Sequence, residues 1–227
     1  MNTSLNKTGF YVSLATGIIT LITFAVAIGT PPLSGPFCTG NCFEYPYSDI
    51  ASRFPRDYYW MFGAIVLSFS YLMMMGVVHQ TTAPDKKLYS QIGLQLATMA
   101  SLVLIVDYFL QLSVIQASLL AGETEGIAQL SQFNPHGIFI VLEEIGFLLM
   151  IFSFFALAPA FKGHKALQWT VSISFALAVL SFILVSFQHG IEREYRFEVI
   201  VISITWLEVM VVSGMLAGRY RKSQFTN

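Results

Sequence analysis

Residues 137–161 read GIFIVLEEIGFLLMIFSFFALAPAF. A helix needs about 20 mostly apolar residues to cross a bilayer, and this run is long enough. Two acids, Glu143 and Glu144, lie inside it without a Lys or Arg beside them. A charged side chain at the centre of a bilayer costs about 2.5–3.5 kcal/mol even on the mildest insertion scale, so such acids usually face a bundle interior or a water-filled cavity. The run therefore predicts a membrane-spanning helix with a polar site along it.

The rest of the chain has the composition of a multi-span membrane protein. Of its 227 residues, 55% are hydrophobic and 11% are charged, whereas about 25% are charged in an ordinary soluble domain. Only helices and closed barrels satisfy every backbone group in lipid, and the apolar runs lack the alternation of barrel strands. We predict an all-α fold, a single transmembrane domain of six helices. The predicted spans are residues 9–30, 58–79, 88–114, 137–161, 166–187 and 197–218.

Basic residues divide unevenly between the two sides that six spans define. One side carries Lys7, Lys86, Lys87, Lys162, Lys165, Arg219, Arg221 and Lys222, and the other carries Arg53, Arg56, Arg193 and Arg196. The positive-inside rule then places both termini in the cytoplasm of an integral membrane protein. The net charge of −1 argues against nucleic acid as a partner.

The first apolar run has two interpretations. Lys7, the apolar residues after it and Ala25-Val26-Ala27 resemble a signal peptide that would be cleaved after residue 27. The run is roughly 18 residues long, and signal peptides usually have about 7–15 apolar residues, which favours a retained helix. Cleavage would leave five spans and an external N-terminus.

The first external loop, residues 31–57, contains the only two cysteines, Cys38 and Cys42. Because this side of the membrane is oxidising, we expect a disulfide between them. Two cysteines alone do not make a metal site. The loop is also rich in prolines and aromatic residues, namely Pro31, Pro32, Pro36, Pro46, Pro55, Phe37, Phe43, Tyr45, Tyr47 and Phe54. This composition predicts a stiff lid over the bundle, or an aromatic belt at the headgroups together with Tyr58, Tyr59 and Trp60.

The second external link, residues 115–134, is interrupted by Gly122 and Gly126. We expect a helical extension, a break and then a short amphipathic surface helix. Asn134 and Pro135 are typical of a helix start, and we expect them to open the fourth span as its N-cap and first residue. The two halves of the chain share no sequence pattern, so an inverted repeat is not indicated.

Four acids inside the spans are the main candidates for a functional site: Asp107, Glu143, Glu144 and Glu208. At 1.5 Å per residue, Asp107 lies about 10 Å from the external end of its span. Glu143 and Glu144 lie at a similar depth, and Glu208 lies near the middle of the last span. The first three acids therefore share a level in the external half of the membrane.

Helical spacing adds polar neighbours to these acids. Gln111 shares a face with Asp107, and His136 lies on the stripe of Glu143 at the mouth of its span. His136 has a second interpretation, as an interfacial residue.

A further row of polar residues runs along one face of the last span. Glu198, Thr205 and Glu208 share this face and predict a polar track from the external surface to mid-membrane. Ser and Thr residues in the spans also serve helix packing, so Thr205 has a structural interpretation as well.

The spans contain no basic residue that could neutralise the acids, so we expect some of these carboxyls to carry protons at neutral pH. A protonated carboxyl releases its proton when water or a cationic ligand arrives, which is the basis of a proton relay or a cation site. The leading hypothesis is a small transporter without a cofactor, in which these acids handle protons or a small polar or cationic solute.

Two other functions stay open. One is an intramembrane enzyme acting on lipid, with the carboxyls as acid and base or as metal ligands together with His136. The other is a sensor, assembly or structural protein, in which the acids tie helices together. The sequence lacks H-E-x-x-H, G-x-S-x-G and a phosphate-binding glycine loop, which argues against the common enzyme classes. It does not decide the oligomeric state.

Overall fold

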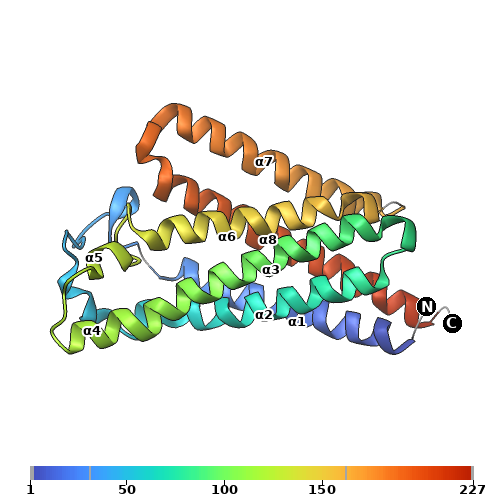
Figure 1. The fold of residues 1–227 in the computed structure, drawn as a ribbon, viewed down its shortest axis with the longest axis horizontal. Helices are drawn as coiled ribbons and strands as arrows, with labels where there is room; N and C mark the ends of the chain where they lie inside the picture. Colours follow the sequence, from blue (N-terminus) through green and yellow to red (C-terminus); the bar gives the residue numbers. More distant parts are fainter. Residues whose placement is uncertain (1–2, 31, 162, 226–227) are drawn as a thin grey trace.

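The computed structural model describes residues 3–30, 32–161 and 163–225, and every regular element within these ranges is a helix. The predicted all-α class is therefore confirmed. The predictions that involve Pro31 and Lys162 lie outside the described residues. The long helices are α1 (Thr3–Ile28), α2 (Tyr59–Thr81), α3 (Lys87–Leu110), α6 (Ile138–Ala156), α7 (Lys165–His189) and α8 (Glu194–Phe225) (Figure 1).

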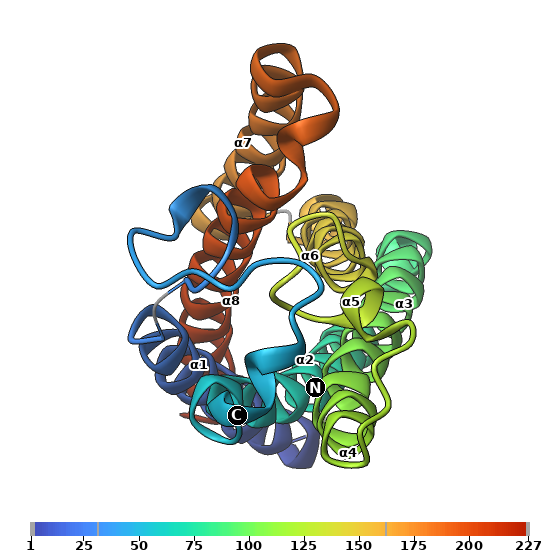
Figure 2. The ribbon, with the colours of Figure 1, turned by 90° about the vertical axis from the view of Figure 1, so that its left-hand side faces the viewer.

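Five of the long helices form a closed ring. Contacts run from α1 to α2, α2 to α3, α3 to α6, α6 to α8, and from α8 back to α1. The helix α7 lies outside this ring, against α6 and α8 (Figure 2). Because α7 crosses outside, α6 and α8 run in the same direction as neighbours, and the other ring contacts are antiparallel. Of the acids on these helices, Glu143 of α6 and Glu198 of α8 line a cavity inside the ring.

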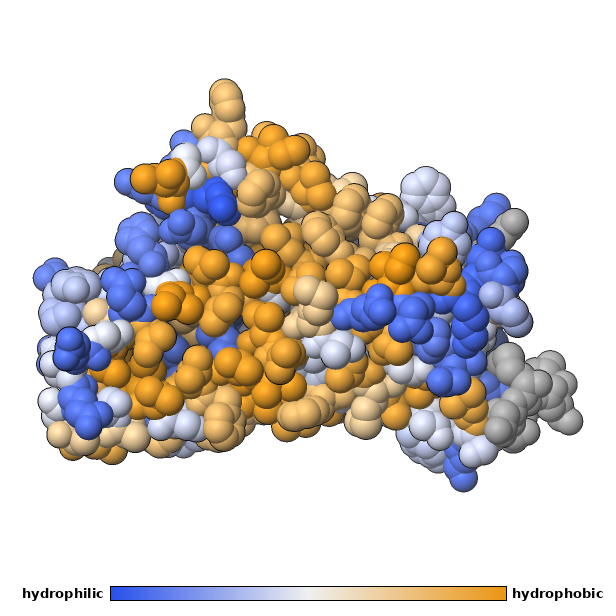
Figure 3. All heavy atoms as spheres, viewed as in Figure 1, coloured by the Kyte–Doolittle hydropathy of each residue, from blue (hydrophilic) through white to orange (hydrophobic). Residues whose placement is uncertain are grey.

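Five helical stretches of the described chain are long and apolar enough to cross a membrane: Ser4–Ile28, Arg56–Thr81, Pro84–Leu120, Ile138–Ala156 and Lys165–Ser223. The last has 59 residues and would be about 90 Å long if straight, against a hydrocarbon core of about 30 Å. The chain instead reverses at Gly190, which has a positive φ of 59°, so α7 and α8 lie antiparallel (Figure 1). On the face seen in Figure 3, apolar residues cover the middle of the bundle between more hydrophilic ends. These features are those of an integral membrane protein.

The third helical stretch continues beyond the predicted end at residue 114. A π-helical segment (Gln111–Ile115) follows α3, and α4 (Gln116–Leu120) continues it. Gly122 and Gly126 then adopt positive φ values of 78° and 76°, which glycine tolerates best, and they break the helix.

The short helix α5 (Ile127–Leu130) follows this break, as predicted, but it is not a surface helix. Its residues Ile127 and Ala128 are buried in the core. With only one turn, α5 has too little surface to lie on a membrane as an amphipathic helix, and its apolar side chains pack inward instead.

The predicted N-cap and first residue of the fourth span, Asn134 and Pro135, are wrong. Helix α6 begins at Ile138, with Gly137 as its N-cap. Asn134 stabilises the turn before the helix: its Oδ1 accepts a hydrogen bond from the backbone N–H of His136 at 3.0 Å, and its Nδ2 donates to the carbonyl of Ala128 at 2.8 Å. Asn side chains bond nearby backbone equally well in turns and at N-caps, so the residue type did not distinguish the two.

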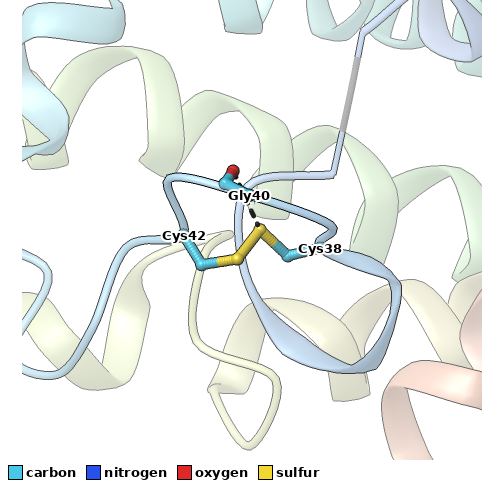
Figure 4. The surroundings of a disulfide bond; sticks show 3 residues. All are labelled: Cys38, Gly40 and Cys42. Carbon is cyan, nitrogen blue, oxygen red and sulfur yellow. Dashed lines mark hydrogen bonds between the residues drawn. A yellow bond between two sulfur atoms is a disulfide. The ribbon is translucent and has the colours of Figure 1, made fainter.

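The predicted disulfide between Cys38 and Cys42 is present, with a Cα–Cα distance of 6.0 Å. Figure 4 shows Sγ of Cys38 near the carbonyl oxygen of Gly40, at 3.7 Å. A disulfide sulfur carries no proton to donate, so this approach is a van der Waals contact. Asn41 adopts a positive φ of 49° inside the loop, a conformation that Asn tolerates better than most residues.

The segment 32–58 packs onto one end of the bundle, which we call the loop end because α4, α5 and the α7–α8 turn also lie there (Figures 1 and 2). The rings of Phe43 and Phe133 pack edge to face with their centroids 5.3 Å apart, and the centroids of the Phe37 and Tyr195 rings are 5.7 Å apart. Ile50 is completely buried. The segment is therefore anchored to the bundle by its aromatic and apolar side chains, and it covers part of the ring.

Helices α3 and α6 approach closely at Gly93. A Cβ atom there would lie 2.9 Å from the backbone oxygen of Ser153, which cannot move without shifting α6. We expect Gly93→Ala to lower the free energy of unfolding by about 1–3 kcal/mol, the usual cost of overpacking. Thermal unfolding of the purified protein in detergent measures this loss. Gly214→Ala is the matched control, because a Cβ atom at Gly214 meets nothing within 4 Å. Equal stability of the two variants would contradict the close approach.

Candidate solute-binding site

A cavity of about 320 Å³ lies inside the ring at the loop end. Helices α1, α6 and α8 form its walls, together with the start of α2 and the chain segments 32–37 and 132–133. Its lining combines aromatic rings with acids: Phe24, Trp60, Phe133, Phe139, Tyr195 and Trp206, with Asp57, Glu143 and Glu198. Its volume falls at the lower end of the range of small-molecule sites.

Glu143 of α6 and Glu198 of α8 meet in this cavity. Their carboxyl groups lie within hydrogen-bonding reach of each other, and they are only 1% and 4% exposed. Two ionised carboxylates have no proton to donate, so a hydrogen bond between them requires that the pair hold at least one proton. Tyr108 of α3 donates a second hydrogen bond to Oε1 of Glu143, at 2.6 Å. Three helices of the ring therefore fix this carboxyl pair.

Two carboxyl oxygens at or near the pair have no hydrogen-bond partner. Within the described residues, Oε2 of Glu198 is buried without a hydrogen-bond partner, and so is Oδ2 of Asp107. Asp107 does not line the cavity, but it is close enough to interact electrostatically with Glu143 and Glu198. A buried polar group without a partner costs several kcal/mol in lipid. The Glu198 side chain lines the cavity, whereas its Oε2 is itself buried.

Aromatic rings close the bottom of the cavity. The ring centroid of Trp206 lies 5.4 Å from that of Phe24, 6.5 Å from that of Trp60 and 6.2 Å from that of Phe147. Trp60 also contacts Tyr108 at 5.3 Å. We call Trp60, Tyr108, Phe147 and Trp206 the aromatic floor. It separates the cavity from the other half of the bundle.

Glu144 does not join this site, and the expectation that no basic residue neutralises the acids is wrong for it. Arg193, in the turn between α7 and α8, donates to Glu144 at 3.4 Å. The Arg193 guanidinium also lies over the ring of Phe182, at 4.6 Å. As the 100° offset along the helix predicts, Glu144 points away from Glu143, and it ties α6 to the α7–α8 turn.

Two other candidates hold loops at the loop end. Nε2 of Gln111 donates to the carbonyl of Leu130 at 2.5 Å, and the backbone N–H of Gln132 donates to its Oε1 at 3.0 Å. Gln111 therefore fixes the turn after α5 and is not brought to the cavity with the acids. His136 is exposed and lies 3.3 Å from the carboxylate of Glu194, which fits its interfacial interpretation.

The predicted polar track along α8 is interrupted. Glu198 lines the cavity, but Thr205 and Glu208 do not, because the lining ends at Trp206. The Thr205 hydroxyl donates to the carbonyl of Val201 at 2.7 Å. Glu208 approaches Ser174 of α7, yet neither of its carboxyl oxygens makes a well-formed hydrogen bond within the described chain. Glu208 is thus a separate buried acid on the far side of the aromatic floor.

The metal hypothesis needs His136 beside the carboxyls. Across residues 3–30, 32–161 and 163–225, no three His, Cys, Asp or Glu side chains lie close enough together to hold a metal ion. The chain matches no protein-family model, no curated protein and no solved structure.

Sequence reasoning missed two parts of the site. It placed Glu198 on the polar track of the last span but did not pair it with Glu143, and it gave no role to Trp206. The spacing of these two residues on α8, about two helical turns, is the signal that could have linked them. The pairing of Arg193 with Glu144 depends on where α7 lies, and spacing along the chain does not determine this.

The pair of Arg193 and Glu144 can be tested by a double-mutant cycle. We expect Arg193→Gln to lower the free energy of unfolding by about 1–3 kcal/mol, because it leaves the Glu144 carboxylate buried without its charged partner. Glu144→Gln in the same protein should restore part of this loss. Thermal unfolding in detergent, followed by tryptophan fluorescence, gives all four stabilities. If the two single effects simply add in the double variant, the residues do not interact.

Proposed function

We propose that this protein is a small membrane transporter that exchanges protons for an organic cation at the pair of Glu143 and Glu198. The observation that carries the proposal is a pair of buried carboxyls in an aromatic-lined cavity, and we infer that the two share a proton. The free Oε2 of Glu198 supplies an acceptor for a ligand. Of the functions considered for the embedded acids, this one uses the cavity, the rings and the acids together.

The lining of the cavity suits a cation better than an anion or a neutral polar solute. A cation over the face of a Trp, Tyr or Phe ring gains about 0.5–2 kcal/mol, and more as the site loses water. Seven aromatic residues, Phe37 among them, line this cavity, and its three acids are almost completely buried. Of these acids, Asp57 is already paired with Arg56, at 2.6 Å. The carboxyl pair is therefore the part of the lining that is left to neutralise a ligand.

The exchange conserves charge at the site. When an organic cation enters, the pair releases its shared proton to water in the cavity, and a carboxylate then faces the ligand. One positive charge arrives and one leaves, so the buried site is never left with an additional uncompensated charge. Return of the proton from the other side of the membrane releases the ligand there. Asp107, which interacts electrostatically with the pair, adds to the attraction for a cation.

Transport also requires that the cavity open to each side in turn. The described conformation has its cavity at the loop end, and the aromatic floor blocks the other half. Glu208 is the next buried acid beyond the floor. We propose that rearrangement of Trp60 and Trp206 connects the cavity with the region of Glu208, so that the ligand or the proton continues through the bundle.

We further propose six spans, with both termini in the cytoplasm and the loop end outside. Helices α7 and α8 have 25 and 32 residues, and each exceeds the length of about 20 residues that a span needs. Helix α1 begins and α8 ends at the same end of the bundle (Figure 1). This is the end with more basic residues, as the positive-inside rule requires of the cytoplasmic side. The disulfide then lies on the oxidising side.

The exchange is testable in proteoliposomes with radiolabelled phenyltrimethylammonium. This quaternary cation has no neutral form that could cross the bilayer by itself. We expect uptake when the vesicle interior is acidic, with proton release reported by an internal pH dye. Glu143→Gln and Glu198→Gln should each lower the uptake by more than about tenfold, the equivalent of ~1.4 kcal/mol.

Glu123→Gln is the control for this experiment, because Glu123 lies exposed in the link between α4 and α5. It should transport like the unaltered protein. Undiminished uptake in both pair variants, or uptake without proton movement, would refute the exchange and leave the acids with a structural role.

The topology has its own test. We expect a C-terminal fusion to green fluorescent protein to fluoresce in a bacterial host, because the tag folds only in the cytoplasm, and a C-terminal alkaline phosphatase fusion to be inactive. Fusions after Gly190 should show the opposite pattern. An active phosphatase at the C-terminus would contradict the proposed orientation or the number of spans.

A further inference from the structure

The register between α1 and α8 determines where the cavity meets the outside of the bundle. A Cβ atom at Gly17 would lie 2.7 Å from Oγ of Ser213, and Phe24 contacts Trp206. The seven residues from Gly17 to Phe24 on α1 therefore lie alongside the seven residues from Ser213 back to Trp206 on α8, as expected for antiparallel helices. The same register places Ile28, the last residue of α1, level with Ile202.

Helix α8 extends beyond this level. From Ile202 back to its first residue, Glu194, it continues for about 12 Å, and α1 has already ended there. The chain after α1 lies against α8 again at Gly35, where a Cβ atom would lie 2.6 Å from the ring of Tyr195. The stretch of α8 between Tyr195 and Ile202 therefore lies beyond the end of α1 and does not pack against that helix. Val199 lies in this interval and lines the cavity.

The exposed residues of the cavity lining gather at this gap. Ile28 is 69% exposed and Val199 is 37% exposed, and Pro32 and Phe37 are exposed beside them. All four line the cavity and all four are apolar. In contrast, the charged lining residues are almost completely buried. A ligand entering here passes an apolar rim before it reaches an acid.

We propose that the cavity opens sideways into the lipid between the end of α1 and α8, and that its ligand is an amphiphilic cation with an ammonium head and an apolar tail. The head lies at Glu143 and Glu198 among the aromatic rings, and the tail leaves past Val199 into the outer part of the bilayer. This inference rests on the proposed cation site, and it adds the class of ligand and its route. The apolar rim favours a lipid-borne ligand, because a small hydrophilic ion gains nothing from it.

The test compares alkyltrimethylammonium ions with butyl, octyl and dodecyl chains against phenyltrimethylammonium, with the protein in nanodiscs. Dissociation constants are calculated from the free ligand concentration in water. The amount of ligand that dissolves in protein-free nanodiscs is measured separately and subtracted from the total bound ligand. We expect affinity to rise about fourfold for each methylene that leaves water. Glu198→Gln should abolish binding of every member of the series.

Three tryptophan variants locate the opening. Val199→Trp and Ser203→Trp place bulk on α8 beside the gap, and we expect each to weaken dodecyltrimethylammonium binding at least tenfold, equivalent to ~1.4 kcal/mol. Leu207→Trp is the matched control, because Leu207 is exposed on the same helix but does not line the cavity. Thermal unfolding identifies any variant that fails to fold, and either rim position alone suffices for the test.

The outcomes separate this inference from the proposed function. Binding that is independent of chain length and of both rim variants, but still lost in Glu198→Gln, overturns the lateral opening and leaves the cation site in place. Absence of Glu198-dependent binding for every quaternary ammonium ion overturns both.

Discussion

The contact between α1 and α8, the first and the last long helices, is the constraint on which the rest of the structure depends. Small residues permit it, since Gly9 lies against the ring of Tyr220 and Gly17 lies against Ser213. Small residues at an interface let helices in lipid approach closely, which is the main source of their attraction there. This contact closes the ring, excludes α7 from it, and turns Glu198 inward toward Glu143. It also leaves the cavity open where α1 ends before α8 does.

The embedded acids differ in how each is compensated, and this difference separates structural from functional residues. Glu144 has a charged partner in Arg193 and connects two parts of the bundle. Glu143 and Glu198 are compensated mainly by each other and by Tyr108, an arrangement that needs a proton. Removal of that proton leaves negative charge in a site of low polarity, which only a cation can balance. The proposed exchange follows from this requirement.

The sequence predicted the fold class, because this follows from the length and periodicity of apolar runs, and helical spacing placed Asp107 at the level of Glu143, with which it interacts. It predicted the disulfide from the spacing of Cys38 and Cys42 and from their place in an external loop. It did not predict that α7 lies outside the ring. A membrane-spanning helix is apolar both where it faces lipid and where it faces another helix, so hydropathy does not indicate which helices are in contact. The partner of Glu144 and the role of Glu198 depend on those contacts and could not be inferred.

The pairing of the first helix with the last has a consequence for biosynthesis. Helix α1 reaches the membrane well before α8, its main partner, has been made. Until α8 arrives, the ring is open between α1 and α6, and the acids of α3 and α6 face that opening without the carboxyl of Glu198. Contacts so distant along the chain form slowly. The nascent chain therefore passes through a stage with polar groups exposed to lipid, and the ring closes only after α8 has been made.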